Sequence, residues 1–141
     1  MVGGQVLDIA EDRPAQLDYL VKLHRMKTGA LIKAACRMGA IAGRGGEAEV
    51  NAAEIYGDAI GLAFQIADDL LDLTATTADL GKRAGKDAEA GKATLPALLG
   101  VEEARRRAAD YCEEALQAFA GLGARAEALR ALARFVVSRR K

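Results

Sequence analysis

The feature that most constrains this chain is an apolar run, Ala59 to Leu73, that carries three aspartates at helical spacing. The run has no proline and one glycine, and apolar residues recur every three or four positions, which predicts a helix. On that helix Asp68 and Asp72 share a face, and Gln65 lies one turn before Asp68. Asp69 lies about 100° round the helix from Asp68. Burying this acidic face without partners is costly, so it requires cations or water.

Two interpretations of the three carboxylates remain open at this point. Carboxylates without a neighbouring His or Cys suit a hard, oxygen-preferring ion such as Mg²⁺, which commonly bridges protein carboxylates to substrate phosphates. The alternative is an amphipathic helix whose aspartates face water. Lysines elsewhere in the chain favour the first interpretation.

Composition predicts an all-α fold for residues 1–141, as one domain or part of one. The chain is 51% hydrophobic with only two prolines, and it is rich in Ala, Leu, Glu and Arg, as helical proteins are. A net charge of zero argues against general binding to nucleic acid or a membrane surface. No apolar run reaches the ~20 residues that span a bilayer, and no signal segment opens the chain. We therefore expect a soluble, cytoplasmic protein in which Cys36 and Cys112 are free thiols.

Apolar periodicity and helix breakers divide the chain into several helical segments. The expected segments are residues 1–11, 17–42, 47–74, a short restart at 95–97, 101–122 and 124–140. The expected apolar stripes contain Leu17, Leu20, Val21, Leu23, Leu31, Ile32, Ala35, Met38 and Ile41 in the second segment, and Tyr56, Ile60, Ala63, Phe64, Ala67 and Leu71 in the third. Core candidates in the last two segments are Leu116, Phe119, Leu129, Leu132, Phe135 and Val136.

A short polar interruption, Lys27-Thr28-Gly29, lies inside the second helical segment. A mid-helix glycine costs about 1 kcal/mol relative to alanine, so Gly29 marks either a kink or a close approach of the backbone to a ligand. The alternative is a solvated lysine beside a weak helix former. For His24, the only histidine, we expect a packing or surface role.

Residues 74–94 form the longest segment predicted to be non-helical, and they alternate glycine with lysine. Gly81-Lys82, Gly85-Lys86 and Gly91-Lys92 follow directly after the acidic helix. Lysines on a glycine-jointed loop suit closure over a polyphosphate, although a solvated charged linker is the alternative. The spacing is not that of a Walker A loop.

Together these segments resemble the trans-prenyltransferases, the short-chain polyprenyl diphosphate synthases, and especially the bacterial farnesyl and geranylgeranyl diphosphate synthases. The segments that carry the resemblance, in the family's order and over the whole chain, are Gly4-Gln5-Val6-Leu7-Asp8, His24 to Leu31, Phe64 to Asp72, Gly81-Lys82, Gly85-Lys86-Asp87, Gly91 to Pro96 and the basic end Arg139-Arg140-Lys141. Each motif is weak by itself, but the set is highly specific.

The resemblance implies a fold, a reaction and a set of site residues. The fold is the helical bundle of the isoprenoid synthases, and the reaction condenses an allylic diphosphate with isopentenyl diphosphate, with Mg²⁺ as cofactor. Asp68 is the foremost implied metal ligand, supported by Asp69 and Asp72. The other implied roles are diphosphate binding for Lys27 and Lys82, oxygen dipoles near the carbocation for Thr28 and Gln65, isopentenyl diphosphate binding for Arg139, and a place in or near the substrate cavity for Gln5.

One departure from the family pattern is large. The family's first aspartate-rich motif, DDxxD, is absent, since Asp68-Asp69 is the only pair of adjacent aspartates. We therefore expect the C-terminal half of the synthase fold, with negligible activity by itself and an exposed apolar stripe. Such a chain would form a homodimer or associate with an N-terminal half. The alternatives are a non-catalytic partner subunit of a synthase, a terpene cyclase, and a helical interaction module with a fortuitous aspartate cluster.

Overall fold

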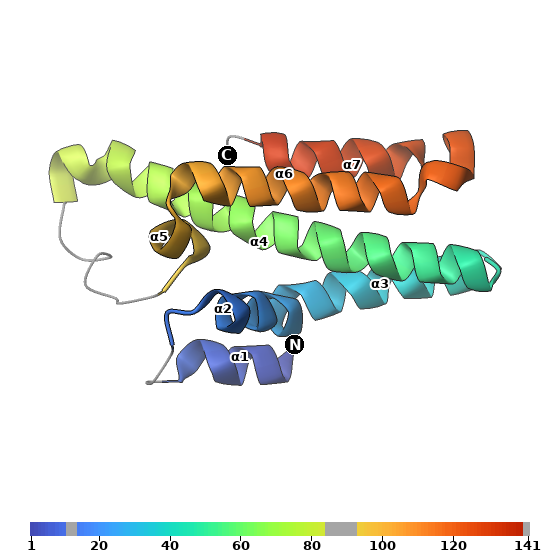
Figure 1. Cartoon of the computed structure of the whole chain (residues 1–141), viewed down its shortest axis with the longest axis horizontal. Coiled ribbons are helices and arrows are strands. Elements are labelled where there is room, and N and C mark those ends of the chain that lie inside the picture. Colours follow the sequence, from blue (N-terminus) through green and yellow to red (C-terminus); the bar gives the residue numbers. More distant parts are fainter. Residues whose placement is uncertain (11–13, 84–92, 140–141) are drawn as a thin grey trace.

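One long helix organises the computed structural model, and the other helices pack along its two sides (Figure 1). The structure describes residues 1–10, 14–83 and 93–139, and only the backbone of residues 74–83. Over those ranges it contains helices and no strand, so the all-α prediction is confirmed. The helices are α1 (Val2–Ile9), α2 (Leu17–His24), α3 (Ala30–Ala42), α4 (Glu47–Arg83), α5 (Leu95–Leu99), α6 (Val101–Ala118) and α7 (Glu127–Ser138).

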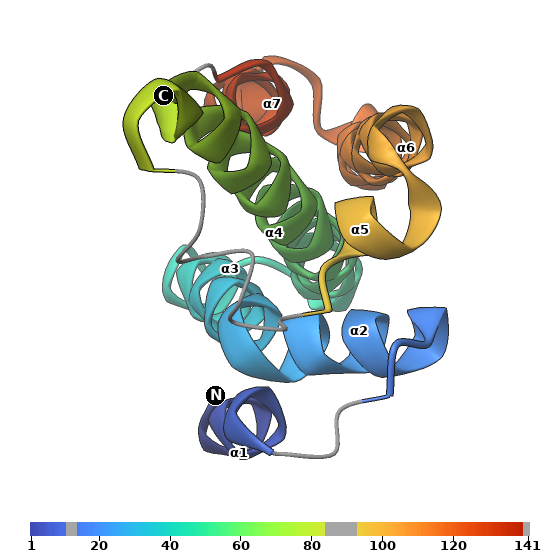
Figure 2. The ribbon, with the colours of Figure 1, turned by 90° about the vertical axis from the view of Figure 1, so that its left-hand side faces the viewer.

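Helix α4 separates two groups of helices. Figure 2 shows α5, α6 and α7 on one side of α4, and α3, α2 and then α1 on the other. A π-helical turn, Arg25–Gly29, joins α2 to α3, and a 3₁₀ segment, Ala120–Ala126, joins α6 to α7. None of the helices in the described ranges is both long and apolar enough to span a bilayer.

The restart of helix at residue 95 is confirmed, and its cap explains it. The Thr94 hydroxyl accepts a hydrogen bond from the Ala97 amide (3.3 Å), and Pro96 lies in the first turn, where its missing N–H costs nothing. The predicted end of the central helix at Thr74 is wrong, because α4 continues to Arg83. Residues 74–80 contain neither proline nor glycine, so nothing in that stretch interrupts the backbone hydrogen bonds.

Two apolar clusters form the core, and both are centred on α4. In one, Tyr56 stacks on Phe119 with ring centroids 4.7 Å apart, and α7 contributes Ala133 and Val136. In the other, Ile66 of α4 packs with residues of α2, α5 and α6. The predicted stripe of α4 is therefore confirmed at its buried members, Tyr56, Ile60, Ala63 and Ala67.

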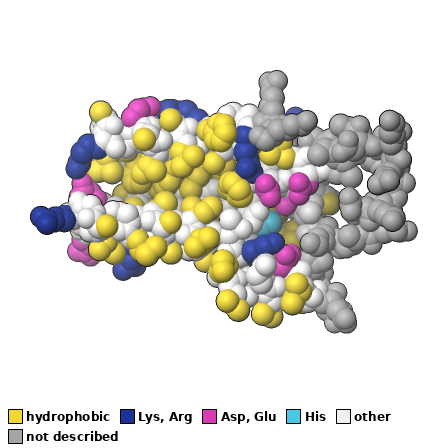
Figure 3. Space-filling view, turned by 180° about the vertical axis from the view of Figure 1, so that it is seen from behind, with side chains coloured by type: hydrophobic (Ala, Val, Ile, Leu, Met, Phe, Trp, Pro, Cys, Tyr) yellow, Lys and Arg dark blue, Asp and Glu magenta, His cyan; other side chains and the backbone are white. Residues whose placement is uncertain are grey.

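Several residues predicted as core or stripe positions lie at the surface instead. They are Leu31, Met38 and Ile41 of α3, and Leu129, Leu132 and Phe135 of α7, all more than a third exposed. We call these six residues the apolar face. Figure 3 shows hydrophobic side chains spread over the side of the molecule that α3 and α7 form. Apolar periodicity locates the stripe on each helix, but it does not reveal whether a neighbouring helix covers that stripe.

Glycines allow α3 and α4 to approach closely. A Cβ atom on Gly57 would lie 2.7 Å from the Cα of Lys33, and one on Gly61 would lie 2.8 Å from the Cα of Gly29. Both glycines therefore face backbone, which cannot rotate away as a side chain can. At Gly29 the turn is π-helical and its backbone approaches Gly61 of α4, and the expected approach to a ligand stays a prediction.

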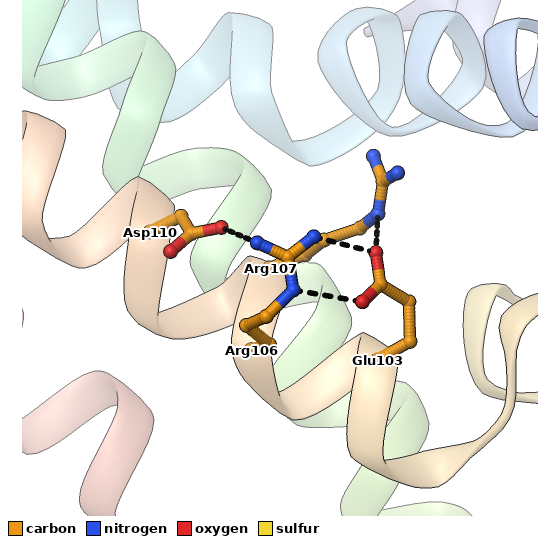
Figure 4. Close-up of polar contacts among 4 residues, drawn as sticks. All are labelled: Glu103, Arg106, Arg107 and Asp110. Atoms are coloured by element: carbon orange, nitrogen blue, oxygen red, sulfur yellow. Dashed lines mark hydrogen bonds and ion pairs between the residues drawn. The ribbon is translucent and has the colours of Figure 1, made fainter.

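Helix α6 carries a local network of charges that includes Arg106 and Arg107 (Figure 4). Glu103 accepts hydrogen bonds from Arg106 (2.7 and 2.8 Å) and Arg107 (2.9 Å), and Arg106 also reaches Asp110 (2.7 Å). Hydrogen bonds from Arg106 and Arg107 lower the pKa of Glu103 to about 2. Because these pairs lie three and four residues apart on one helix, they support α6 rather than form a site.

Tyr56→Phe should lower the free energy of unfolding by about 1 kcal/mol at pH 7. The Tyr56 hydroxyl donates to the Leu129 carbonyl (2.8 Å), which joins α4 to α7. Burial, with a smaller contribution from the Cys36 and Cys112 thiols, raises the pKa of Tyr56 to about 12. Between pH 10 and 12 the unfolded chain thus loses this proton while the folded chain keeps it, and stability falls as pH rises. The free energy of unfolding, measured with urea at pH 7 and pH 11, should decline less between these pH values for Tyr56→Phe than for wild type. An equal decline in the two proteins would contradict the assignment.

Candidate functional site

The π-helical turn Arg25–Gly29 carries two polar residues of the predicted site, Lys27 and Thr28, and directly follows His24. π turns contain an extra residue, and they occur often at functional sites. The α2–α3 segment runs antiparallel to α4. His24 lies against Asp69, and Thr28, four residues after His24, lies against Gln65, four residues before Asp69. Lys27 lies between them in sequence and reaches toward α1.

Lys27 is held by α1, which packs directly on the π turn. Its Nζ lies 2.7 Å from Oδ2 of Asp8, and both side chains are partly buried. A Cβ atom on Gly4 would lie 2.3 Å from the Lys27 amide nitrogen, so only glycine lets α1 approach this closely. The Tyr19 hydroxyl donates to the Leu7 carbonyl (3.0 Å) and ties α1 to α2. The lysine ammonium group is therefore held near α1, and the side chain as a whole is 33% exposed.

Thr28 and Gln65 form a hydrogen bond across the α2–α4 contact. The Thr28 hydroxyl donates to Oε1 of Gln65 (2.5 Å), and Gln65 is buried. A buried amide with one defined partner has a fixed orientation, because losing that partner would leave a desolvated polar group. The predicted pair is thus brought together, one helical turn from Asp68.

Asp68 pairs with Arg139 at the end of α7. Nη2 of Arg139 lies 3.0 Å from Oδ1 of Asp68, and the guanidinium carbon lies 4.2 Å from the centre of the Phe64 ring. The arginine side chain is 17% exposed, whereas Asp68 is 47% exposed. Asp68 therefore combines a positive neighbour with open access from solvent.

Asp69 faces the opposite neighbour, His24 of α2. Nε2 of His24 lies 3.5 Å from Oδ2 of Asp69, and His24 is more than nine-tenths buried. Neither of these two atoms, nor Nδ1 of His24, makes a hydrogen bond within the described part of the chain. In Figure 3 the histidine, acidic and basic side chains gather beside the apolar surface.

The acidic residues fit Mg²⁺ as a donor set, although they do not complete a cage. Among the described side chains no three His, Cys, Asp or Glu residues lie close enough together to hold a metal ion. Mg²⁺ typically takes one or two protein carboxylates and fills its other positions with water and substrate phosphate. The accessible Asp68 carboxylate and the less accessible Asp69 carboxylate, whose side chain is 16% exposed, match that demand.

The described contacts do not bring Gln5 into this group, and they do not test Asp72 or Lys82. Gln5 lies exposed on α1, next to the buried Gly4. Asp72 is exposed one turn beyond Asp68 on α4. The side chain of Lys82, like the loop residues Lys86 and Lys92, lies outside the described residues.

Three residues for which no role in the site is predicted contact the predicted site residues: Asp8, His24 and Phe64. A signal for His24 was present in the sequence, because it lies four residues before Thr28 and so shares its helix face. For Asp8 no local signal existed, since its contact with Lys27 joins two helices whose packing the sequence does not specify. Phe64 was predicted as a stripe residue, and its contact with Arg139 depends on where α7 ends.

Comparison with known proteins agrees with the geometry. Residues 1–132 match the family model described as polyprenyl synthetase. The chain is 47% identical over 146 residues to the farnesyl diphosphate synthase of Escherichia coli (strain K12), covering all of this chain and 49% of that protein. It is 41% identical to geranylgeranyl pyrophosphate synthase 9, chloroplastic, of Arabidopsis thaliana, covering 99% of this chain and 40% of that protein.

A solved structure gives the same result for the fold. The crystal structure of an FPP/GFPP synthase from Zymomonas mobilis superposes with a TM-score of 0.78 at 37% identity, covering 96% of this chain and 45% of that one. The chain thus spans about half the length of the curated relatives it matches.

Proposed function

Since the chain belongs to the polyprenyl synthetase family, we propose that it contributes the second aspartate-rich motif and its lysine partner to prenyl transfer. The proposed reaction condenses an allylic diphosphate with isopentenyl diphosphate and releases diphosphate, as in farnesyl or geranylgeranyl diphosphate synthesis. The observation that supports the proposal is a set of three contacts between helices: Lys27 with Asp8 of α1, Gln65 of α4 with Thr28 of the π turn, and Asp68 of α4 with Arg139. Both charges that a metal–diphosphate complex requires are present there.

In the proposed mechanism the C1–O bond of the allylic diphosphate breaks, and the electron pair leaves with diphosphate. The double bond of isopentenyl diphosphate then attacks C1, and loss of a proton restores a double bond. Mg²⁺, when bound by Asp68 with Asp69 and Asp72 in support, would neutralise the departing diphosphate.

The chain's own side chains have distinct proposed roles. Lys27 donates charge-assisted hydrogen bonds to the allylic diphosphate, with Lys82 as a second donor. The Thr28 and Gln65 oxygens face the developing carbocation as dipoles, and their mutual hydrogen bond fixes their direction. Arg139 exchanges its contact with Asp68 for isopentenyl diphosphate, and Gln5 stands near the substrate cavity.

Prenyl transfer also requires apolar surface that receives the prenyl chain and keeps water from the reacting carbons. One such surface, a groove of about 570 Å³, lies between α3, α4 and the α6–α7 connection and contains Ala53, Phe119 and Leu129.

Asp68→Ala should abolish or weaken by at least about tenfold, or 1.4 kcal/mol, the Mg²⁺-dependent binding of inorganic diphosphate to this chain. The reason is that Asp68, which pairs with Arg139, keeps an accessible carboxylate. Isothermal titration with diphosphate, with and without Mg²⁺, measures the effect.

Asp58→Ala is the matched control for this experiment. Asp58 also lies on α4 and also pairs with an arginine at 3.0 Å, namely Arg25, but neither residue has a proposed role in binding metal or diphosphate. Its loss should leave diphosphate affinity unchanged. If wild-type protein binds no diphosphate in the presence of Mg²⁺, or if both variants lose affinity equally, the proposed function is wrong.

A second candidate function, that of a subunit that associates with a partner chain, is favoured by the apolar face. Six large apolar residues exposed on α3 and α7 exceed what scattered surface positions require. The proposed partners are a second copy or an N-terminal half of a synthase. We place the protein in the cytoplasm, where the unpaired thiols of Cys36 and Cys112 stay reduced.

A further inference from the structure

We propose that His24 is a positioning residue that holds the Asp69 carboxylate in place for metal binding. This inference rests on the proposed function, because it assigns a role to His24 within the same site. The residue is not itself a proposed metal ligand or a group that touches substrate. It acts through Asp69.

The burial of His24 is the first observation. The side chain ends α2 and is more than nine-tenths buried, yet neither ring nitrogen makes a hydrogen bond with a described residue. A buried imidazole without partners is unfavourable, because its polar nitrogens have lost their contacts with water. Such a residue in a folded core calls for an explanation beyond packing.

The direction of the ring supplies that explanation. Nε2 lies 3.5 Å from Oδ2 of Asp69, and Oδ2 is itself buried without a hydrogen-bond donor. Both atoms therefore lack a partner and face each other. An N–H···O bond has a length of about 2.7–3.2 Å, so a shift of a few tenths of an ångström completes it.

The Asp69 side chain is 16% exposed, so it lies between the buried imidazole and the open surface. A hydrogen bond from His24 to this inner oxygen would keep the carboxylate from turning out into solvent and leave its other oxygen, Oδ1, available to a metal ion. Groups that orient a metal ligand in this way commonly raise affinity for the metal. The π turn that follows His24 fixes the ring, because its backbone joins α2 to the tight α3–α4 contact.

The test compares three substitutions at His24 by their Mg²⁺-dependent affinity for inorganic diphosphate. His24→Leu keeps the volume but removes the nitrogen, and should weaken binding about 10- to 100-fold. His24→Asn keeps a polar group that is too short to reach Asp69, and should weaken binding similarly. His24→Gln places an amide N–H near the position of Nε2, and should restore affinity to within about threefold of wild type, well inside one factor of ten.

Thermal melting separates this role from a structural one. His24→Leu leaves Oδ2 of Asp69 buried without a donor, so its melting temperature should fall somewhat, and affinity is compared at a temperature at which every variant remains folded. Titration of Mn²⁺, followed by its electron paramagnetic resonance signal, reports metal binding without turnover. Equal affinity of His24→Leu and wild type would overturn the proposal, and so would a loss that His24→Gln does not restore.

A double-mutant cycle tests whether His24 acts through Asp69. In an Asp69→Asn background, His24→Leu should reduce affinity by less than about threefold, because the carboxylate that it positions is already gone. Losses that multiply independently would overturn the proposal. Wild-type protein that binds no diphosphate with Mg²⁺ would instead reject the proposed function, so the two failures are distinguishable.

Discussion

Gly61→Ala is expected to lower the free energy of unfolding by about 1–3 kcal/mol. The new methyl group would lie 2.8 Å from the Cα of Gly29 and 3.7 Å from its carbonyl carbon and oxygen. Backbone atoms cannot move aside as a flexible side chain does, so the π turn and α4 must separate. The nearby Thr28–Gln65 hydrogen bond crosses the same contact and should lengthen or break. Urea unfolding followed by circular dichroism measures the loss.

Gly39→Ala provides the matched control for Gly61→Ala. Gly39 also lies within a helix, α3, but a Cβ atom there would meet nothing within 4 Å. Alanine should therefore stabilise the protein by about 0.5–1 kcal/mol through helix propensity alone. Two variants that shift stability in the same direction would show that the contact between the π turn and α4 is looser than described.

Lys27→Met is expected to weaken binding of inorganic diphosphate about 10- to 100-fold, which corresponds to a charged hydrogen bond of about 1.5–3 kcal/mol. Lys27 lies in the π turn and pairs with Asp8 of α1, and one-third of its side chain stays exposed to solvent. Methionine keeps most of the volume of the side chain and removes the charge. The affinity should also lose part of its dependence on salt, because one charge no longer contributes.

Lys22→Met is the control for the lysine prediction. Lys22 lies on α2, five residues before Lys27, and is exposed on the outer side of that helix. It carries the same charge at nearly the same place in the chain, so a general electrostatic effect would weaken both variants alike. Equal affinities of Lys22→Met and Lys27→Met for diphosphate, measured by calorimetry, would remove Lys27 from the site.

Much of the architecture was predictable because helix signals are local. The spacing of Tyr56, Ile60 and Ala63 identified the buried side of α4, and Pro96 identified the start of α5. The extension of α4 to Arg83 was missed because the glycine–lysine pattern of residues 81–92 suggested a loop that begins directly after the aspartates. Helix propensity in residues 74–80 decided the outcome instead.

The contacts of the candidate site were less predictable, since they depend on how helices pack. Spacing alone placed Gln65 one turn before Asp68, but the partners of these residues come from other helices: Thr28 from the π turn and Arg139 from the end of α7. His24 was assigned to packing because no partner was evident beside it in sequence. Its neighbour, Asp69, lies 45 positions away along the chain and became visible only once α2 and α4 were placed side by side.

The π turn at Arg25–Gly29 has a consequence for how this region tolerates change in length. Its extra residue rotates α2 relative to α3. The polar residues before the turn and the glycine contacts after it therefore approach α4 in different helical registers. Deleting one residue there would turn α2 by about 100°. Either His24 and Lys27 would then lose their neighbours, or the glycines would lose theirs. We therefore expect this segment to tolerate substitutions of single residues better than insertions or deletions.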